Sequence, residues 1–340
     1  MSQRVSVAAS AKGTFAALLV GAVVLCAGWP GRAQAQALAS GEARQWLARM
    51  HAAATQRNYQ GTLVVSAEGA IASSRVAHYG DGGNTLERVE FLDGQPRRVL
   101  RHNDQVLTLW PSARVARLEQ REAVQAFPAL QSGVEDQLFE RYEMVAEADA
   151  RVAGHDVAVF LLRPRDDMRF AQRLWADRAS SLLLRADVLG SDGRVLETSA
   201  FSDISIGGRA KPESVQSVLK QLDGWRVMKP VVQSTDLEAE GWKLKAPVAG
   251  FRKASCVKRQ LDAETDAGRS DVLQAIYTDG LTHVSLFIEP QRPDRQRAGA
   301  SAMGATHTWM QPHGTSWVTV MGDVPMATLK QFAAALEKRR

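Results

Sequence analysis

The chain has 340 residues, of which 45% are hydrophobic and 23% charged, so it is long enough for two domains that each bury a core. Its formal net charge of +5 comes from 42 basic and 37 acidic residues, a near balance that gives no indication of nucleic-acid binding. Two cysteines in the whole chain exclude a fold that depends on a set of disulfides.

Residues 1–35 have the pattern of a secretory signal peptide. Arg4 and Lys12 precede an apolar core from residue 14 to residue 27, and the small-x-small sequence Ala33-Gln34-Ala35 follows. An uncleaved membrane anchor is the alternative, but about 14 apolar residues are fewer than the roughly 20 that span a bilayer. We therefore predict cleavage after Ala35, which removes three basic residues and lowers the net charge from +5 to +2.

Charge is divided unevenly along the mature chain. Residues 36–208 hold 20 Arg, no Lys and 23 acidic residues, whereas residues 209–340 hold 19 basic and 14 acidic residues. Positive charge in the second half suits an acidic partner segment or an anionic membrane surface, with a solvated surface as the alternative.

Cys256, the one cysteine left after cleavage, lies in a basic stretch. We expect a structural thiol, although cationic neighbours can activate a cysteine.

A helix followed by regularly spaced short strands is predicted for the start of the mature chain. The helix has Ser40 as its cap and an apolar stripe at helical spacing that consists of Ala43, Trp46, Leu47, Met50 and Ala54. Strands are predicted at residues 62–66, 75–79, 85–92, 97–102, 105–110 and 114–119, with Gly82-Gly83, Asp93-Gly94 and Asn103-Asp104 as turns. No long helix alternates with these strands, so an antiparallel meander is favoured over a parallel nucleotide-binding sheet.

The rest of the first half continues this pattern. Helical or irregular structure is predicted between residues 123 and 142, and strands resume at 150–162. Two more strands, at 181–190 and 195–206, flank Asp192-Gly193, a strong hairpin signal. Residues 36–208 are therefore predicted to form a single curved antiparallel sheet covered by a few helices.

A curved sheet that does not close must cover its inner apolar face with helices or with a ligand. Strand alternation places six candidate cavity-lining residues on one face of their strands: Leu63, Val65, Leu107, Leu109, Val159 and Leu161. An ordinary packed core is the alternative for each, because sequence alone does not separate a filled interior from one that a ligand can enter.

A change of composition at residues 207–212 predicts a linker, residues 209–235, before a second domain, residues 236–340. Within the linker, a short amphipathic helix after Pro212 that packs between domains or docks a partner is predicted from Val215, Val218, Leu219 and Leu222. The second domain is predicted to contain a turn and strand within 277–290, strands at 299–310 and 317–321, and a final helix with Pro325 in its first turn and Lys338, Arg339 and Arg340 at its end.

No set of residues with the chemistry of an active site is found. His307 and His313 are near in sequence, but no cysteine or Glu-x-x-His element accompanies them as a metal site would require. Asp166 and Asp167 resemble a carboxylate pair, yet adjacent side chains diverge, and surface ion pairing is indicated by the neighbouring Arg163, Arg165 and Arg169. The sequence therefore predicts a protein that is not an enzyme, with no metal and no cofactor.

Several blocks of the chain resemble one family. Residues 163–177 are similar to its P-x-D-x-x-R-(Y/F) … L-W-x-D run, and residues 277–290 to its Y-S-D-G-L-x-x-V-S-V-F-(I/V)-E segment, with Thr278 and Leu286 as departures. Shorter similar blocks are Asn58-Tyr59-Gln60-Gly61-Thr62, Glu240-Gly241-Trp242 with Pro247 and Gly250-Phe251, and Gly322-Asp323-Val324-Pro325. Their order matches that of the MucB/RseB proteins, which are periplasmic regulators of an envelope-stress sigma factor.

The resemblance implies an α+β fold, with an N-terminal LolA-like half-open antiparallel β-barrel, covering helices and a smaller α+β C-terminal domain. It implies a periplasmic protein that binds the periplasmic part of a transmembrane anti-sigma factor (MucA/RseA-like) and protects it from proteolysis. Release would be triggered by a lipid, a lipopolysaccharide or the acyl chains of a mislocalised lipoprotein.

Partner binding is expected in the C-terminal domain, with six candidate residues: Trp242, Phe251, Arg252, Lys253, Lys258 and Arg259. No nucleic-acid partner is expected, and a homodimer is left open. A simple lipid or lipoprotein carrier is the alternative function, with hydrolysis a weaker one. A LolA-type carrier has no counterpart to residues 236–340, so the second domain favours the regulator.

Overall fold

A computed structural model describes residues 36–81, 83–120, 135–208, 213–246, 248–261, 270–292, 294 and 296–339. Residues 34–340 form one compact unit. The predicted signal peptide, residues 123–134 of the segment predicted as helical or irregular, and residues 209–212 at the start of the linker lie outside the described residues. Within the described ranges, no helix has the length and apolar character needed to cross a membrane.

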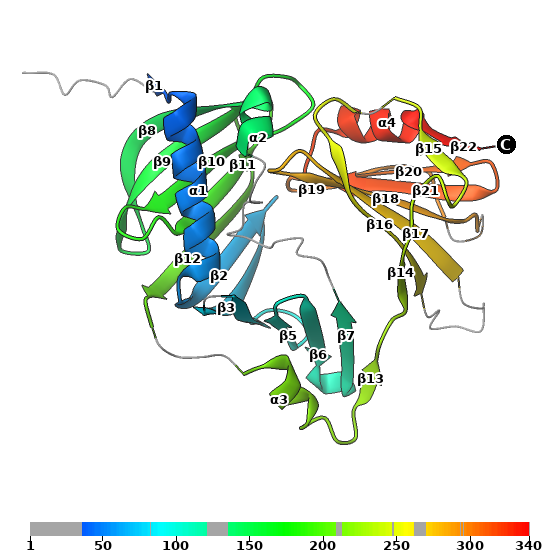
Figure 1. Ribbon diagram of the computed structural model, residues 1–340, viewed down its shortest axis with the longest axis horizontal. Coiled ribbons are helices and arrows are strands. Elements are labelled where there is room, and N and C mark those ends of the chain that lie inside the picture. Colours follow the sequence, from blue (N-terminus) through cyan, green and yellow to red (C-terminus); the bar gives the residue numbers. More distant parts are fainter. Residues whose placement is uncertain are drawn as a thin grey trace, which may run out of the picture. The chain divides into compact units, whose positions relative to one another are not determined.

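The first sheet has thirteen strands in the described part of the chain (Figure 1). In chain order they are β1 (Gln36–Ala37), β2 (Tyr59–Ala67), β3 (Ala70–Asp81), β4 (Asn84–Phe91), β5 (Arg97–His102), β6 (Gln105–Trp110), β7 (Val115–Gln120), β8 (Tyr142–Val152), β9 (His155–Pro164), β10 (Ala171–Asp177), β11 (Leu183–Leu189), β12 (Val195–Ile206) and β13 (Arg226–Met228). Their spatial order is β1-β8-β9-β10-β11-β12-β2-β3-β4-β5-β6-β7-β13. The end strands β1 and β13 do not pair with each other, so the sheet is open.

The predicted meander is confirmed, because consecutive strands from β2 to β7 pair antiparallel. β5 and β6 have the predicted bounds, since Asn103 adopts a left-handed conformation (φ 54°) that closes the turn between them. The hairpin at Asp192-Gly193 is also confirmed, with β11 and β12 antiparallel on either side. Among the described strands of this sheet, β13 alone pairs in parallel, with β7.

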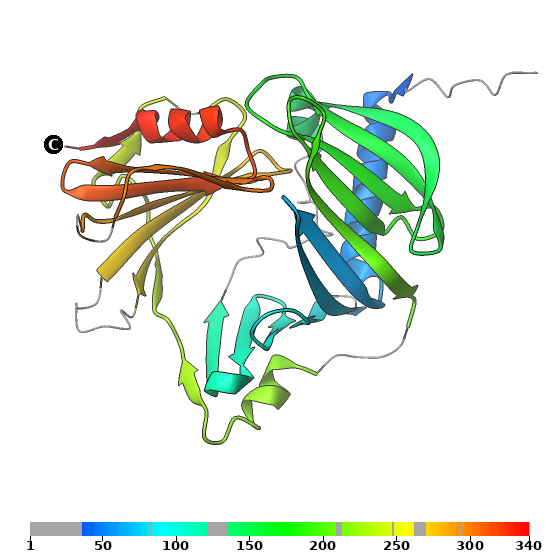
Figure 2. The ribbon, with the colours of Figure 1, turned by 180° about the vertical axis from the view of Figure 1, so that it is seen from behind.

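Helix α1 (Ser40–Gln56) lies across one face of strands β8–β12 (Figure 1), and Figure 2 shows these strands from the other side, with α1 behind them. Its apolar stripe is buried as predicted: Leu47 and Met50 share a cluster with Phe160 and Leu162 of β9. The prediction of Ser40 as the cap is wrong. Ala39 occupies that position without a side-chain hydrogen bond, so burial of the stripe, rather than a cap, positions the helix.

Two short helices and a 3-10 turn complete the first part. They are the turn Pro111–Ala113, α2 (Glu135–Arg141) and α3 (Val215–Leu219). The predicted linker helix is confirmed in α3, which begins after Ser214, whose side chain accepts a hydrogen bond from the Ser217 N–H. Its buried residues, Val215 and Val218, pack against strands β5–β7.

The second sheet has seven strands in the described residues, in the order β14-β16-β17-β18-β21-β20-β19. They are β14 (Val232–Ser234), β16 (Arg252–Leu261), β17 (Ser270–Thr278), β18 (His283–Pro290), β19 (Gly299–Met303), β20 (Thr306–His313) and β21 (Ser316–Gly322). Helix α4 (Met326–Ala335) packs on this sheet, and a two-stranded ribbon pairs β15 (Trp242–Leu244) with β22 (Leu336–Lys338). The core between sheet and helix includes Leu286, Val318, Val320, Leu329 and Phe332.

Two predictions for the second domain are corrected. The strand predicted at 299–310 is two strands, because Gly304 (φ 58°) turns the chain between β19 and β20. The final helix ends at Ala335, with Pro325 at its cap position rather than in its first turn. Lys338 belongs to β22, where backbone pairing with Trp242 replaces the helical hydrogen bonds.

The fold class is α+β, as predicted: an open antiparallel sheet with covering helices, and a second, smaller sheet with its own helix. The predicted linker contributes strands to both sheets, β13 to the first and β14 to the second.

Candidate functional site at the junction of the two sheets

The loop between β9 and β10 presents a buried arginine to the second sheet. Asp166 turns this loop by accepting a hydrogen bond from the Met168 N–H at 3.0 Å. The Arg169 side chain that follows is 0% exposed. The surface ion pairing predicted for this arginine is therefore wrong, because its guanidinium lies in the interior between the two sheets.

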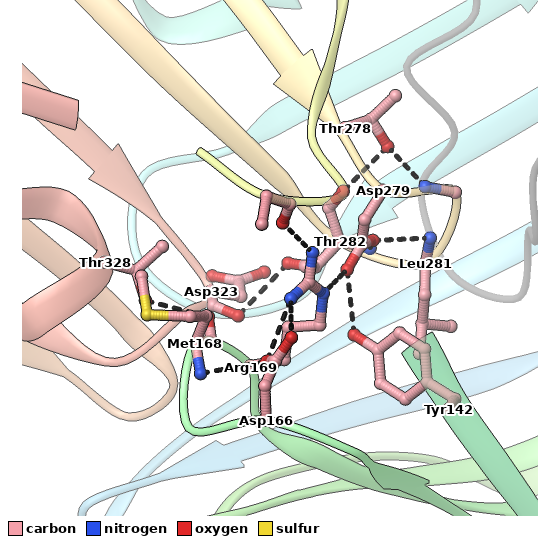
Figure 3. A network of polar contacts seen from close by, with 12 residues as sticks. Tyr142, Asp166, Met168, Arg169, Thr278, Asp279, Leu281, Thr282, Asp323 and Thr328 are labelled. Carbon is pink, nitrogen blue, oxygen red and sulfur yellow. Dashed lines mark hydrogen bonds and ion pairs between the residues drawn. The ribbon is translucent and has the colours of Figure 1, made fainter. Parts of the chain in front are cut away.

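Every nitrogen of the Arg169 guanidinium donates a hydrogen bond (Figure 3). Nη1 donates to the two oxygens of Asp166 at 2.9 and 2.6 Å. Nε donates to Asp279 Oδ2 at 2.7 Å, and Nη2 to the carbonyl of Ala249 at 2.6 Å. Asp166 belongs to the first part of the chain and Asp279 to the second, so one side chain joins them. Such complete pairing is what a buried charge requires.

Asp279 is positioned by its own turn, between β17 and β18. Its Oδ1 accepts hydrogen bonds from the N–H groups of Leu281 and Thr282, at 3.0 and 2.9 Å. The Thr278 hydroxyl closes the turn, because it donates to the Thr282 carbonyl at 2.7 Å and accepts from the Gly280 N–H at 3.0 Å. These bonds leave Asp279 Oδ2 to face the first sheet.

Tyr142, the first residue of β8, is the second donor to Asp279 Oδ2, at a distance of 3.0 Å. Burial raises the pKa of the Tyr142 phenol well above its ordinary value, and the charge of Asp279 raises it further. Burial alone would lower the pKa of Arg169, but the neighbouring carboxylates Asp279 and Asp166 outweigh it and raise that pKa. The phenol therefore stays neutral and the guanidinium charged, which is the combination that the hydrogen bonds need.

Apolar side chains cross the junction in both directions. Met168 packs against the core of the second sheet, and its carbonyl accepts a hydrogen bond from the Thr328 hydroxyl of α4 at 2.8 Å. In return, Leu281 packs against the cluster under α1. The Phe251 ring lies 4.8 Å from the Arg169 guanidinium carbon, a favourable cation–π distance. The junction thus combines a buried ion pair with exchanged apolar contacts.

A second contact joins the tips of two hairpins. A β-carbon added to Gly304 would lie 2.6 Å from the β-carbon of Ala67. Close by, the His307 ring meets Phe170 edge to face, with ring centroids 5.5 Å apart. Burial raises the pKa of Glu197 in this region, and the charge of Asp323 adds to that rise.

In the residues that the structure describes, no group of three or more His, Cys, Asp or Glu side chains is placed to hold a metal ion. His307 and His313 lie six residues apart on one strand, β20, which corresponds to roughly 20 Å. The His313 ring contacts Trp242 instead, at 5.3 Å between centroids. This pair therefore cannot share an ion.

The two loops that meet at the junction fall in separate family domains. The sequence model of the MucB/RseB N-terminal domain matches residues 42–219, which include Arg169, and that of the MucB/RseB C-terminal domain matches residues 236–337, which include Asp279. The chain belongs to the MucB/RseB family.

Relatives in the MucB/RseB family match along most of their length. MucB of Pseudomonas aeruginosa, a regulatory protein of the sigma factor AlgU, is 26% identical over 300 residues, covering 87% of this chain and 90% of MucB. RseB of Haemophilus influenzae, a sigma-E factor regulatory protein, is 24% identical over 297 residues, with 87% and 91% covered. A crystal structure of MucB in complex with MucA(peri) superposes with a TM-score of 0.64 at 25% identity, covering 88% of this chain and 99% of that one. The resemblance stated from the sequence blocks is confirmed.

The six cavity candidates of this MucB/RseB protein do not share one face of the first sheet. The register from β2 through β12, β11 and β10 to β9 aligns Val65 with Phe160, which packs under α1. Leu63, two residues away, lies on the same α1 face. The register from β2 to β6 places Leu107 and Leu109 on the opposite face. The same alternation puts Val159 and Leu161 there too.

Burial separates these candidates further. Leu107 and Leu109 are buried in the cluster that α3 covers, and Val159 is buried as well. Leu63, Val65 and Leu161 are half-buried. A ligand on the α1 face would therefore meet Leu63 and Val65, whereas Leu107 and Leu109 are reached only if α3 moves.

The partner-binding candidates divide into core and surface residues. Trp242 and Phe251 are buried in the core of the second sheet, so neither offers its side chain to a partner in this conformation. On β16, Lys253 pairs with Asp236, and Lys258 with Glu240 at 3.1 Å. Arg252 is exposed and Arg259 half-buried.

Cys256, also on β16, is buried and unpaired with another cysteine. Burial raises the pKa of its thiol to about 11. The expectation of a structural thiol is therefore confirmed.

Sequence reasoning found the two blocks that form the junction but not their contact. Arg169 and Asp279 are 110 positions apart, and no local pattern connects residues at that separation. Tyr142 was missed altogether, since it stands next to a segment for which only irregular or helical structure was predicted. The sequence carried little signal for the contact, because residues 163–177 hold seven charged side chains and nothing in the sequence marks Arg169 among them as buried.

Proposed function

We propose that this chain is a periplasmic regulatory protein that binds the periplasmic part of a transmembrane anti-sigma factor. The observation that carries the proposal is the match of both MucB/RseB domain models, in order, along most of the mature chain. Support comes from relatives named as sigma-factor regulatory proteins, and from MucB, whose structure was solved in complex with MucA(peri). The signal-peptide pattern of residues 1–35 supports the periplasmic location.

In this function the chain, when bound, shields the anti-sigma factor from the protease that begins its degradation. A lipid or a mislocalised lipoprotein causes the two proteins to dissociate. Residues 36–208 serve as the sensor, residues 209–235 as the linker and residues 236–340 as the partner-binding domain. Binding and release need no catalytic group. The junction supports such coupling, because a ligand at the first sheet and a partner at the second act on elements that Arg169 joins.

The proposal is tested by a closed binding cycle with the mature chain, the periplasmic segment of the anti-sigma factor from the same bacterium, and a long-chain lipid. We expect saturating lipid to weaken partner binding about 5- to 150-fold, and the partner to weaken lipid binding by the same factor, because coupling is reciprocal. The protein should also slow cleavage of the segment by the protease that degrades the anti-sigma factor. Added lipid should restore the cleavage rate. No partner binding would refute the regulator. Partner binding that lipid leaves unchanged would remove the lipid-release step.

A prediction follows for the two classes of cavity candidate. Leu63→Glu is expected to abolish binding of a fluorescent long-chain lipid with little change in melting temperature, because Leu63 is half-buried on the α1 face. Leu109→Glu is expected to destabilise the protein by several kcal/mol, about the cost of an unpaired buried charge, since α3 covers Leu109. Lipid titrations and thermal melts separate the two outcomes. Leu92→Glu, at a side chain already 45% exposed, is the matched control and should change neither. Unfolding of the Leu63 variant would show that Leu63 does not line an accessible cavity.

A further inference from the structure

The linker supplies an edge strand to each sheet, and no described residue pairs with the outer side of either strand. We define the linker edge as residues 226–234, which consist of β13, the sequence Lys229-Pro230-Val231 and β14. β13 is the end strand of the first sheet, and β14 is an end strand of the second. Figure 1 shows this segment passing from one sheet to the other. An extended chain laid along the linker edge would therefore touch both sheets at once.

Exposed apolar side chains are concentrated on the linker edge. Seven large hydrophobic residues are exposed in the described ranges, and three of them lie within six consecutive positions. They are Val227, Val231 and Val232, at 38%, 69% and 39% exposure. Scattered single exposed residues are normal on a protein surface, whereas three so close together in the sequence favour an interaction site.

Backbone groups of the linker edge are also directed outward. The Arg226 N–H donates inward to the Arg114 carbonyl at 2.9 Å, and the Thr235 N–H donates inward to the Cys256 carbonyl at 3.0 Å. Because successive residues of a strand point their backbone groups to alternate sides, those of Val227 and Ser234 point away from the sheets. An edge with such groups is a template for an added strand.

The charges of the linker edge favour one kind of occupant. Arg226 and Lys229 are its only charged residues, and both are exposed. Neither forms an ion pair with the described carboxylates. A second copy of this edge would place basic residues against basic residues, which disfavours pairing between copies. An extended segment with acidic and apolar side chains complements this surface.

We propose that the linker edge binds an extended, acidic and apolar segment of the partner as an added β-strand. The inference rests on the proposed function, since it assigns the partner a place on this chain. Main-chain hydrogen bonds supply affinity in this mode of recognition, and the exposed valines and the two basic residues supply selectivity. A strand that follows all nine positions, roughly 30 Å, bridges both sheets, so its affinity depends on their mutual arrangement.

The experiment compares binding of the periplasmic segment of the anti-sigma factor from the same bacterium to the mature wild-type chain and three variants. The triple substitution Val227→Ser, Val231→Ser, Val232→Ser is expected to weaken binding at least about tenfold. Ser234→Pro, which removes one outward N–H and keeps the inward ladder, is expected to weaken it about fivefold. The control, Ile71→Ser with Met303→Ser, changes apolar side chains elsewhere that are at least as exposed as the valines and should bind as the wild type does.

Hydrogen exchange on the unmodified protein gives a readout that needs no variant. The amides of Val227 and Ser234 should exchange more slowly when the segment is bound, because outward N–H groups gain partners. Wild-type binding with unchanged exchange at both amides, or full affinity in the valine variant, would overturn the linker-edge inference and leave the proposed function intact. Failure of the wild type to bind would overturn both.

Discussion

Replacing Arg169 by methionine is expected to lower the free energy of unfolding by about 3–5 kcal/mol, the typical cost of breaking a buried ion pair by removing one partner. The substitution keeps much of the side-chain length but leaves Asp279, whose side chain is 0% exposed, as an uncompensated charge. Only the Tyr142 hydroxyl and two backbone N–H groups would still face that carboxylate. Denaturant unfolding followed by tryptophan fluorescence measures the change.

The same measurement should show loss of cooperativity between the two sheets. Arg169 joins them through Asp279 and Ala249, so its removal is expected to resolve two unfolding transitions from the single one of the wild type. Arg163→Met is the matched control, because Arg163 is 57% exposed and 3.8 Å from Glu143; such a pair contributes at most about 1 kcal/mol. Equal effects of the two substitutions would contradict the structural role given to Arg169.

Replacing Gly250 by alanine is expected to cost about 3–4 kcal/mol, from backbone strain and from damage to the ion pair together. Gly250 has φ 80°, a left-handed conformation that favours glycine. An added β-carbon would also overlap the Arg169 guanidinium and lie 2.9 Å from Arg141 Nε. The substitution thus disturbs the junction between the two sheets by displacing the Arg169 side chain.

Gly241→Ala separates these two contributions. Gly241 has nearly the same φ, 78°, but an added β-carbon there meets nothing within 4 Å. It should therefore cost only the strain, about 1–2 kcal/mol. A double-mutant cycle completes the test, because Gly250→Ala should cost less in a chain that already carries Arg169→Met. Additive free energies would show that Gly250 and Arg169 do not interact.

The sequence was most informative where structure depends on neighbouring residues. The strands β5 and β6 were predicted to the residue because Asn103-Asp104 is a turn that local chemistry specifies. The split between β19 and β20 was missed, since Gly304 turns the chain without an accompanying Pro, Asn or Asp. The strands β13 and β14 were missed because three-residue strands beside Lys229-Pro230 exist only through pairing with distant strands.

The candidate site could be predicted only in parts. A charged residue in each family-like block was visible, but burial decides whether a pair such as Arg169 and Asp279 is a surface feature or a structural one. Burial is set by tertiary packing, which also placed Trp242 and Phe251 in the core and Leu107 and Leu109 on the face opposite Leu63. Alternation along one strand predicts which residues share a face, whereas the relation between faces of distant strands depends on the register of every strand between them.

The pairing of β13 with β7 has a consequence for how far the junction can open. Because the linker is held in the first sheet up to Met228 and in the second from Val232, only three residues remain as a tether, which reach at most about 14 Å. A short tether keeps its two ends at an effective concentration in the millimolar range. Opening is then a reversible intramolecular step, so the fraction of molecules with a closed junction is independent of protein concentration in the compartment.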